Sequence, residues 1–217
     1  PEAMLNYLVR LGWSHGDQEI FSVEEMIEFF DIADVNHSAS SFNPEKLLWI
    51  NQQHIMATPA EKLAEALMPF LIRVGLDPAE GPDPVHVVEG FHERAETLLH
   101  MASSARYCYE DFDVIDEKSA KKHLRPVILE PLTVAKDRLG QLEHWGQAAI
   151  HEVIEAVAAD YDINMGKLGQ PIRVAVTSGP VSPPIDVTLW LVGQRRTIER
   201  LERAVELIEA RVAASAG

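Results

Sequence analysis

The chain has 217 residues, of which 47% are hydrophobic, enough for one large domain or two to three small ones and too apolar for a disordered chain. Its 19 basic and 34 acidic residues give a formal net charge of −15, which argues against a general nucleic-acid binder because such a chain repels a polyanion at long range. The lone Cys108 excludes an internal disulfide, and no Cys/His spacing indicates zinc. No signal-like start or apolar run of about 18 residues occurs, so we expect a soluble, cytoplasmic protein without a membrane partner.

Residues 1 to 57 show the pattern of two or three short helices. Ser22 followed three residues later by Glu25 predicts a capping box. Pro44 predicts the first turn of a helix that carries Lys46, which without further information is a solvated helix lysine. The chain opens at Pro1 directly in an amphipathic pattern, from which we expect a piece of a longer protein.

The next stretch predicts two helices separated by a proline-rich linker. In the string TPAE, at residues 58 to 61, Thr58 is expected to cap a helix and Pro59 to take its first position. A second helix is expected to run continuously from Pro84. Its apolar stripe comprises Val88, Phe91, Ala95, Leu98 and Ala102. Arg94 falls at the edge of this stripe, where a salt bridge with a nearby glutamate is the ordinary interpretation.

The middle of the chain carries its one basic cluster, Lys118, Lys121, Lys122, His123 and Arg125. A solvated helix face is the ordinary interpretation of such a cluster. A longer helix from Pro126 completes a first helical unit, which ends at residue 142. A second unit begins near Trp145, and its last helix places apolar side chains on one face and Arg and Glu on the other.

Two short apolar runs near the C-terminus, residues 171 to 179 and 184 to 193, each lie between a proline and a glycine. This framing is typical of a short helix, because proline fits the first turn and glycine fits the position after the last. The alternation of Ile172, Val174 and Val176 instead favours a strand, since β-branched residues at period two fit a pleated sheet. The local pattern alone leans towards the strand.

Three motifs follow one another in this region: KLGQPIRVAVT at residues 167 to 177, a serine-proline pair at 182 and 183, and GQRRTIERL at 193 to 201. In this order they resemble the C-terminal end of bacterial glutamyl-tRNA synthetases, and residues 5 to 55 resemble the segment downstream of the catalytic domain in the same family. The resemblance spans essentially the whole chain. It implies an all-α fold, in which both proline-framed runs are helices.

The domain organisation that the resemblance implies is a stem-contact segment, residues 1–57, followed by two helical anticodon-binding subdomains, residues 58–142 and 143–217. It also implies five tRNA-binding residues. Arg94 matches an arginine that contacts the third anticodon base, Arg173 and Ile185 match residues that flank the first base, and Ser182 lies beside them. Lys46 matches a lysine for which a backbone phosphate contact is expected. Ser178 and the Pro183–Pro184 doublet depart from the family pattern and affect the expected loop geometry.

These residue types suit the expected roles. A guanidinium group offers parallel donors to a base edge, and single-stranded loops expose bases that can be read in this way. A lysine–phosphate contact positions the RNA without reading its sequence. A local cluster can act although the chain is acidic, because salt screens distant charges over roughly 10 Å.

The strings that hold ATP in class I synthetases, one HIGH-like and one KMSKS-like, do not occur, and no other catalytic motif does. We therefore expect this chain alone to be non-catalytic and without a cofactor or metal, with ATP and magnesium used by the full-length glutamate–tRNA ligase. The expected partner is tRNA(Glu), bound by a monomer, with no role for DNA. Two alternatives stay open: a stand-alone adaptor for tRNA or protein, and a helical scaffold without an RNA role. The sequence leaves undecided whether the parent enzyme also charges tRNA(Gln).

Overall fold

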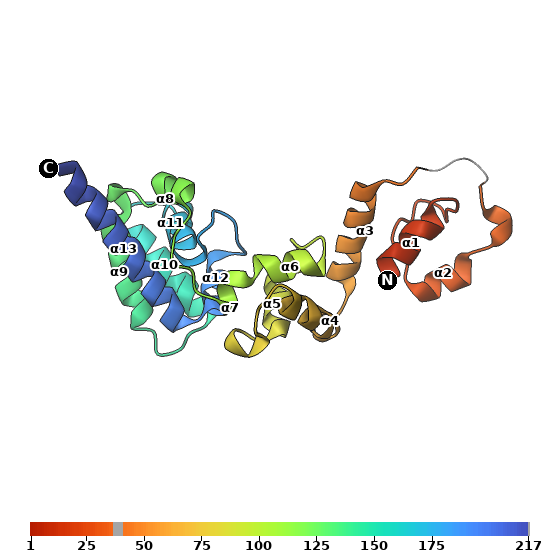
Figure 1. Ribbon diagram of the computed structural model, residues 1–217, viewed down its shortest axis with the longest axis horizontal. Helices are drawn as coiled ribbons and strands as arrows, with labels where there is room; N and C mark the ends of the chain where they lie inside the picture. The colour runs from red at the N-terminus through yellow and green to blue at the C-terminus, as the bar shows by residue number, and fades with distance from the viewer. Residues whose placement is uncertain (37–40, 217) are drawn as a thin grey trace.

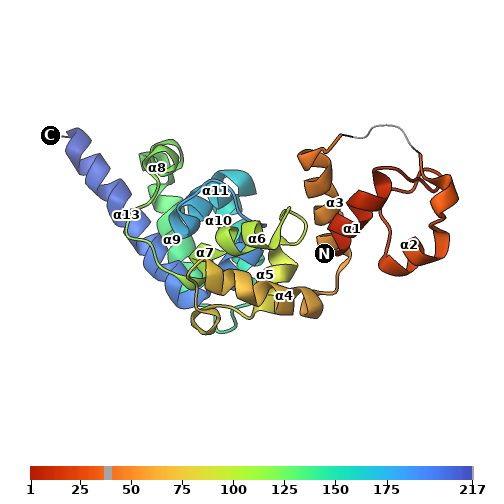
Figure 2. The same cartoon turned by 45° about the vertical axis from the view of Figure 1, so that its right-hand side comes forward.

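The computed structural model of the protein describes residues 1–36 and 41–216, and within these ranges the chain forms helices and short 3₁₀ turns but no strand. The predicted all-α class is confirmed. The helices follow one another along an elongated molecule, with the N-terminal helices at one end and the C-terminus at the other (Figure 1), and this separation persists in the turned view (Figure 2).

The N-terminal unit contains α1 (Glu2–Arg10), α2 (Val23–Phe29), the 3₁₀ turn Ile32–Asp34 and α3 (Pro44–Ala57). Two small cores hold it together, one around Tyr7 and Ile50 and the other around Trp13 and Phe21. The capping box is confirmed: the Glu25 amide donates to Ser22 Oγ at 3.1 Å, and the Ser22 amide donates to Glu25 Oε2 at 2.8 Å.

A small helical group follows, with α4 (Ala60–Arg73), the 3₁₀ turn Pro78–Glu80, α5 (Pro84–Phe91) and α6 (Leu98–Ser104), in which α4 packs against both α5 and α6. The expected cap at Thr58 is wrong. Thr58 instead ends α3, where its hydroxyl donates to the His54 carbonyl at 2.6 Å, and α4 starts at Ala60.

The single helix expected from Pro84 is also wrong, because the chain turns between α5 and α6. The amides of Arg94 and Ala95 both donate to the Phe91 carbonyl, which closes a turn, and the Thr97 side chain then caps α6 by accepting from the His100 amide at 3.0 Å. The apolar spacing was compatible with a continuous helix, but the cap at Thr97 starts a new one. Arg94 consequently lies on a connecting turn.

The C-terminal bundle is formed by α7 (Arg106–Tyr109), α8 (Glu117–His123), the 3₁₀ turn Pro126–Ile128, α9 (Leu129–Gly140), α10 (Gln147–Asp160), α11 (Met165–Thr177), α12 (Ile185–Val192) and α13 (Gln194–Ala216). One continuous core runs from Ile55 to Ile208 through this bundle and the preceding helical group. The division expected between residues 142 and 143 separates α9 from α10, which pack against each other, so it does not coincide with a gap in the packing and stays a prediction.

Both proline-framed runs are helices, as the family resemblance implied and against the local strand pattern. Ile172, Val174 and Val176 are all fully buried on α11 because neighbouring helices cover more than one of its faces. Pro171 lies inside this helix rather than in its first turn. The helix starts six residues earlier, where the Asn164 side chain accepts from the Lys167 amide at 2.8 Å.

Arg200 on α13 is the largest fully buried side chain of the described residues. Its Nη1 donates to the carbonyls of Tyr107 and Val176 at 2.8 and 2.7 Å, and its Nη2 donates to the Glu110 carbonyl at 2.8 Å. Nε and Nη2 also donate to Asp111 Oδ1, at 3.2 and 2.8 Å. The guanidinium thus ties α7, the segment after it and the end of α11 to α13, and all five of its N–H groups are used.

Arg200→Ala should lower the free energy of unfolding by about 3–5 kcal/mol, because it leaves buried carbonyls and Asp111 without their donor. Chemical denaturation of the variant measures the loss. Arg195→Ala on the same helix removes an exposed ion pair with Glu199 and should change stability by less than about 1 kcal/mol. Equal effects of the two substitutions would contradict the structural role of Arg200.

The hydrogen bond from Arg200, with the nearby guanidinium charges, lowers the pKa of Asp111 below its usual range, against a small opposing effect of burial. A carboxyl whose pKa is lowered by folding adds stability above its unfolded pKa and loses it as the pH falls through the folded pKa. Asp111→Asn should therefore destabilise the protein at pH 7, and the difference from wild type should shrink below about pH 4. Urea titrations at several pH values test this, and a difference that is constant with pH would contradict it.

Candidate nucleic-acid interface

Arg173 lies on α11 and holds the loop that leads to α12. Its Nε donates to Ser182 Oγ at 2.7 Å, its Nη1 to Gln170 Oε1 at 2.9 Å, and its Nη2 to the Pro183 carbonyl at 3.1 Å. The side chain is half-buried, and burial together with the charge of Arg94 lowers its pKa without making it neutral at pH 7. One N–H on each terminal nitrogen has no partner among the described residues.

Ser182, within this loop, and Ile185, at the start of α12, are both buried. The Ser182 hydroxyl lies 2.9 Å from Thr188 Oγ1, which itself donates to the Pro183 carbonyl at 3.0 Å. Ile185 is 9% exposed and belongs to the common core. Ser182 therefore supports the loop by hydrogen bonds that include the Arg173 guanidinium, and Ile185 supports it by packing in the core.

Arg94 is exposed on the turn between α5 and α6, and in the part of the chain that the structure describes it makes no side-chain hydrogen bond or ion pair. The rim salt bridge suggested by its sequence neighbours is therefore absent from the described residues. Its charge acts on the pKa of Arg173, which indicates that the two guanidinium groups are near each other although 79 positions separate them. Arg94, on the turn after α5, is thus close enough to Arg173 on α11 for their charges to interact.

Lys46 is not part of this group. It lies on α3 in the N-terminal unit, where its Nζ is 2.8 Å from Glu19 Oε2 and 4.6 Å from the centre of the Trp49 ring. The group formed by α4, α5 and α6 lies between α3 and α12 (Figure 1). Any RNA that contacts both Lys46 and Arg173 must therefore extend along the molecule.

The sequence interpretation missed two side chains that fix the loop, Gln170 and Thr188. Gln170 accepts from Arg173 and donates from Nε2 to the Pro180 carbonyl at 2.9 Å, while Thr188 is completely buried beside Ser182. The only sequence signal for Gln170 is its place three residues before Arg173, which puts the two on one helix face. Thr188 has no such signal, because its role depends on how α12 folds back under the loop.

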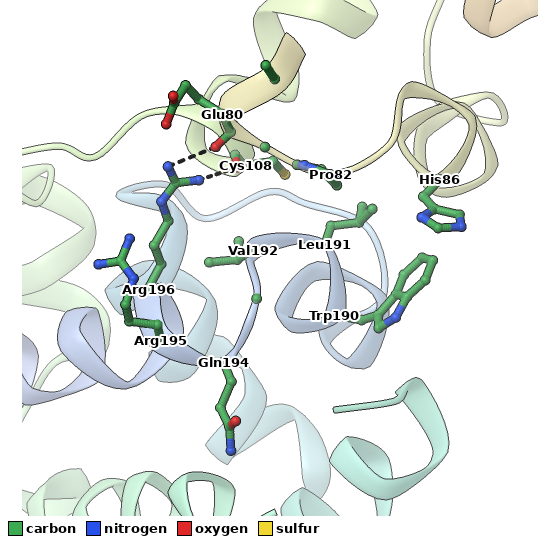
Figure 3. A pocket seen from close by; sticks show the side chains of 13 residues that line it. Glu80, Pro82, His86, Cys108, Trp190, Leu191, Val192, Gln194, Arg195 and Arg196 are labelled. Carbon is green, nitrogen blue, oxygen red and sulfur yellow. Dashed lines mark hydrogen bonds between the residues drawn. The ribbon is translucent and has the colours of Figure 1, made fainter. Parts of the chain in front are cut away.

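A pocket of about 580 Å³ opens at the other end of α12, where α12 meets α13 (Figure 3). Arg196 points across it and donates to the carbonyls of Glu80 and Cys108 at 3.0 and 2.8 Å, and the rings of His86 and Trp190 lie side by side with centroids 4.5 Å apart. The Arg196 guanidinium is thus used to join α13 to the earlier helices. This pocket is separated from Arg173 by the length of α12, about 12 Å for its 8 residues.

No group of three or more His, Cys, Asp or Glu side chains among residues 1–36 and 41–216 could hold a metal ion. In those ranges no helix also combines the length and apolar character that a bilayer-spanning helix requires.

Two family models match the chain. The model described as "Anticodon binding domain" matches residues 62–205, and the model described as "tRNA synthetases class I (E and Q), catalytic domain" matches residues 1–49. The segment expected to be a stem-contact unit therefore overlaps the stretch that the second model assigns to the catalytic domain.

Curated and solved relatives agree with these matches. The chain is 51% identical over 211 residues to glutamate–tRNA ligase 1 of Nitrosococcus oceani, covering 97% of this chain and 45% of that protein. It superposes on the crystal structure of a glutamate tRNA ligase from Elizabethkingia meningosepticum with a TM-score of 0.85 and 25% identity, over 96% of this chain and 41% of the other. For the glutamate-tRNA synthetase of Elizabethkingia anophelis the TM-score is 0.79 at 25% identity, over 95% and 40%.

The chain spans less than half the length of each of these relatives. The anticodon-binding model covers well over half of the chain, and the relatives match nearly all of it. The chain therefore belongs to the anticodon-binding domain family, in the form that glutamyl-tRNA synthetases carry.

Proposed function

We propose that this chain binds tRNA(Glu) and that Arg94 and Arg173 contact its anticodon bases. The observation that carries the proposal is the geometry of Arg173, whose guanidinium the loop at residues 178 to 184 holds through Ser182 and Pro183 while two of its N–H groups stay unused. The charge of Arg94 acts on the same guanidinium and lowers its pKa. Two like charges repel unless something compensates them, and a nucleic acid supplies both the negative charge and the acceptors. The relatives described above are named as glutamate–tRNA ligases, and these names favour tRNA binding over an adaptor or scaffold role.

The two arginines have different tasks in this proposal. Arg94 is free of protein partners in the described chain and offers its whole fork, in our assignment to the third anticodon base. Arg173 holds its own loop with three donors and offers the remaining two, in our assignment to the first base. Ser182 and Ile185 act through the loop, one by orienting Arg173 and the other by packing beneath it.

Lys46 is proposed to contact a backbone phosphate away from the anticodon. Glu19 and Trp49 hold its ammonium group, which keeps the side chain ordered but leaves it more than a third exposed. The ammonium group has three N–H donors, so it can also donate to a phosphate. The contact would position the tRNA without distinguishing its sequence.

The longer protein to which these helices correspond would attach glutamate to tRNA(Glu), with ATP and magnesium, as a cytoplasmic monomer. The described residues offer no cluster that suits a metal ion, so no step of that chemistry is assigned to them. In our proposal their contribution is to bind the tRNA and to favour one anticodon.

The chain should bind glutamate tRNA with strong salt dependence, because each Lys or Arg contact to a phosphate releases counterions. The log–log slope of affinity against salt should be roughly −0.7 per contact on single-stranded RNA. Fluorescence titrations at several salt concentrations measure it. Absence of binding at low salt, or binding that is indifferent to salt, would favour the scaffold alternative.

Arg94→Lys should reduce discrimination at the third anticodon base alone, by about 1–3 kcal/mol, because lysine keeps the charge but loses the planar fork. Arg173→Lys should reduce discrimination at the first anticodon base by a similar amount. A melting temperature equal to that of wild type shows that this variant keeps its fold. The measurement compares the affinities of anticodon stem-loop RNAs that vary at these two bases.

Lys46→Ala is the comparison variant for this experiment. It should weaken full-length tRNAs of any anticodon alike and leave stem-loop binding unchanged, since Lys46 lies in the separate N-terminal unit. If both Arg→Lys variants leave the ranking of stem-loops unchanged, the assignment of the arginines to the bases is wrong, whether or not the chain binds tRNA.

A further inference from the structure

A pocket of about 850 Å³ lies between the end of α8 and the start of α9 on one side and the start of α11 on the other. Residues that are far apart in sequence form it, from Lys122 to Pro131 and from Tyr161 to Pro171. It is a different pocket from the one at the junction of α12 and α13, and no residue lines both.

Unpaired positive charge gathers around this pocket. Most lysines and arginines of the described chain make ion pairs or hydrogen bonds, such as Lys121 with Glu117 on the same helix as Lys122. Three exposed cations at the pocket differ from these: Lys122, Arg125 and Lys167. Among the residues that the structure describes, their side chains make no ion pair and no hydrogen bond. Glu130 is the one acidic side chain among the described lining residues. A chain with a net charge of −15 thus keeps a local excess of cations here.

The pocket adjoins the proposed anticodon site through one shared residue. Gln170 lines it, and the Oε1 of the same side chain accepts from Arg173 Nη1 at 2.9 Å. One glutamine therefore separates the guanidinium proposed to contact the first base from the wall of this pocket. A strand of RNA that reaches Arg173 must continue in one of two directions from it, and the pocket offers unpaired cations in one of them.

Much of the pocket lining is apolar. Val127 is 78% exposed, and Ile163 and Pro171 contribute further apolar surface. Burial and the neighbouring Lys122 lower the pKa of His123, so its ring is neutral at pH 7 and adds no repulsion. Single-stranded RNA is held by this combination, in which cations meet the phosphates and apolar or aromatic surfaces meet the faces of bases and sugars.

We propose that this pocket binds the nucleotide that precedes the first anticodon base, next to the one that Arg173 contacts, with its phosphate on Lys122, Arg125 and Lys167 and its base or ribose on the apolar lining. The inference rests on the proposed tRNA-binding function and extends the interface beyond the anticodon. Because phosphate contacts carry no sequence information, this part of the interface adds affinity for every anticodon.

The test uses the 217-residue chain and anticodon stem-loop RNAs, with Lys122→Ala, Arg125→Ala and Lys167→Ala made one at a time. Each should weaken binding about threefold to tenfold at low salt and reduce the salt slope by roughly 0.7. The loss should be equal for stem-loops of different anticodon sequence, in contrast to Arg94→Lys and Arg173→Lys. Melting temperatures equal to that of wild type establish that the variants fold.

Lys118→Ala is the matched control, because Lys118 is an exposed lysine on α8 that does not line the pocket. If it weakens RNA binding as much as the pocket variants, the effect reflects net charge and the inference is overturned. If only the substitutions of Arg94 and Arg173 weaken binding, the proposed function stands and this inference fails. Wild-type protein that binds no stem-loop at all would refute both. Poly-glutamate serves as a second probe in the same titrations. If the pocket variants bind RNA as the wild type does but no longer bind poly-glutamate, the pocket binds an acidic protein segment and the inference is overturned.

Discussion

The fold of the C-terminal bundle depends on the buried guanidinium of Arg200. A charged group completely removed from water is tolerated only when its donors are satisfied, and Arg200 meets this condition with three carbonyls and the Asp111 carboxylate. The carbonyls belong to segments that helical hydrogen bonding leaves open, at the ends of α7 and α11. By joining these ends to α13, Arg200 holds the end of α11 and the segment after α7 against that helix.

Arg173 also holds a connecting segment through its guanidinium donors, but unlike Arg200 it does not use all of them. Arg173 uses three of its donors on the loop at residues 178 to 184, but it lies at the surface and keeps donors available. In our proposal the loop therefore holds the arginine in place before RNA arrives, which reduces the entropy lost when a base contact forms. A long flexible side chain with no such support, as at Arg94, loses more rotamer freedom on binding.

The acidic composition and the proposed RNA partner are compatible because the charges are distributed unevenly. Many cations are paired inside the protein: Lys136 with Glu202, Arg138 with Asp160 and Arg10 with Glu19. Several of the unpaired ones lie close to the proposed interface, at Arg94 and around the pocket formed by α8, α9 and α11. Salt screens the acidic faces beyond roughly 10 Å, so in our proposal the local excess governs the contact while the net charge limits non-specific binding.

The sequence by itself determined the helical class of the N-terminal unit and the capping box at Ser22, because these follow from local spacing. It also singled out Arg94 and Arg173 as candidates through family motifs, and their contact with bases stays a proposal. Only the tertiary structure decided the rest. The alternation of Ile172, Val174 and Val176 favoured a strand, because a period-two pattern is typical of a strand with one buried face. Neighbouring helices instead cover several faces of α11, so apolar residues at this spacing are buried in a helix. The stripe from Val88 to Ala102 fitted one helix, but the turn after Phe91 and the cap at Thr97 divide it. The contacts of Gln170, Thr188 and Arg200 join segments distant in sequence, and no local pattern encodes which carbonyl a side chain will meet.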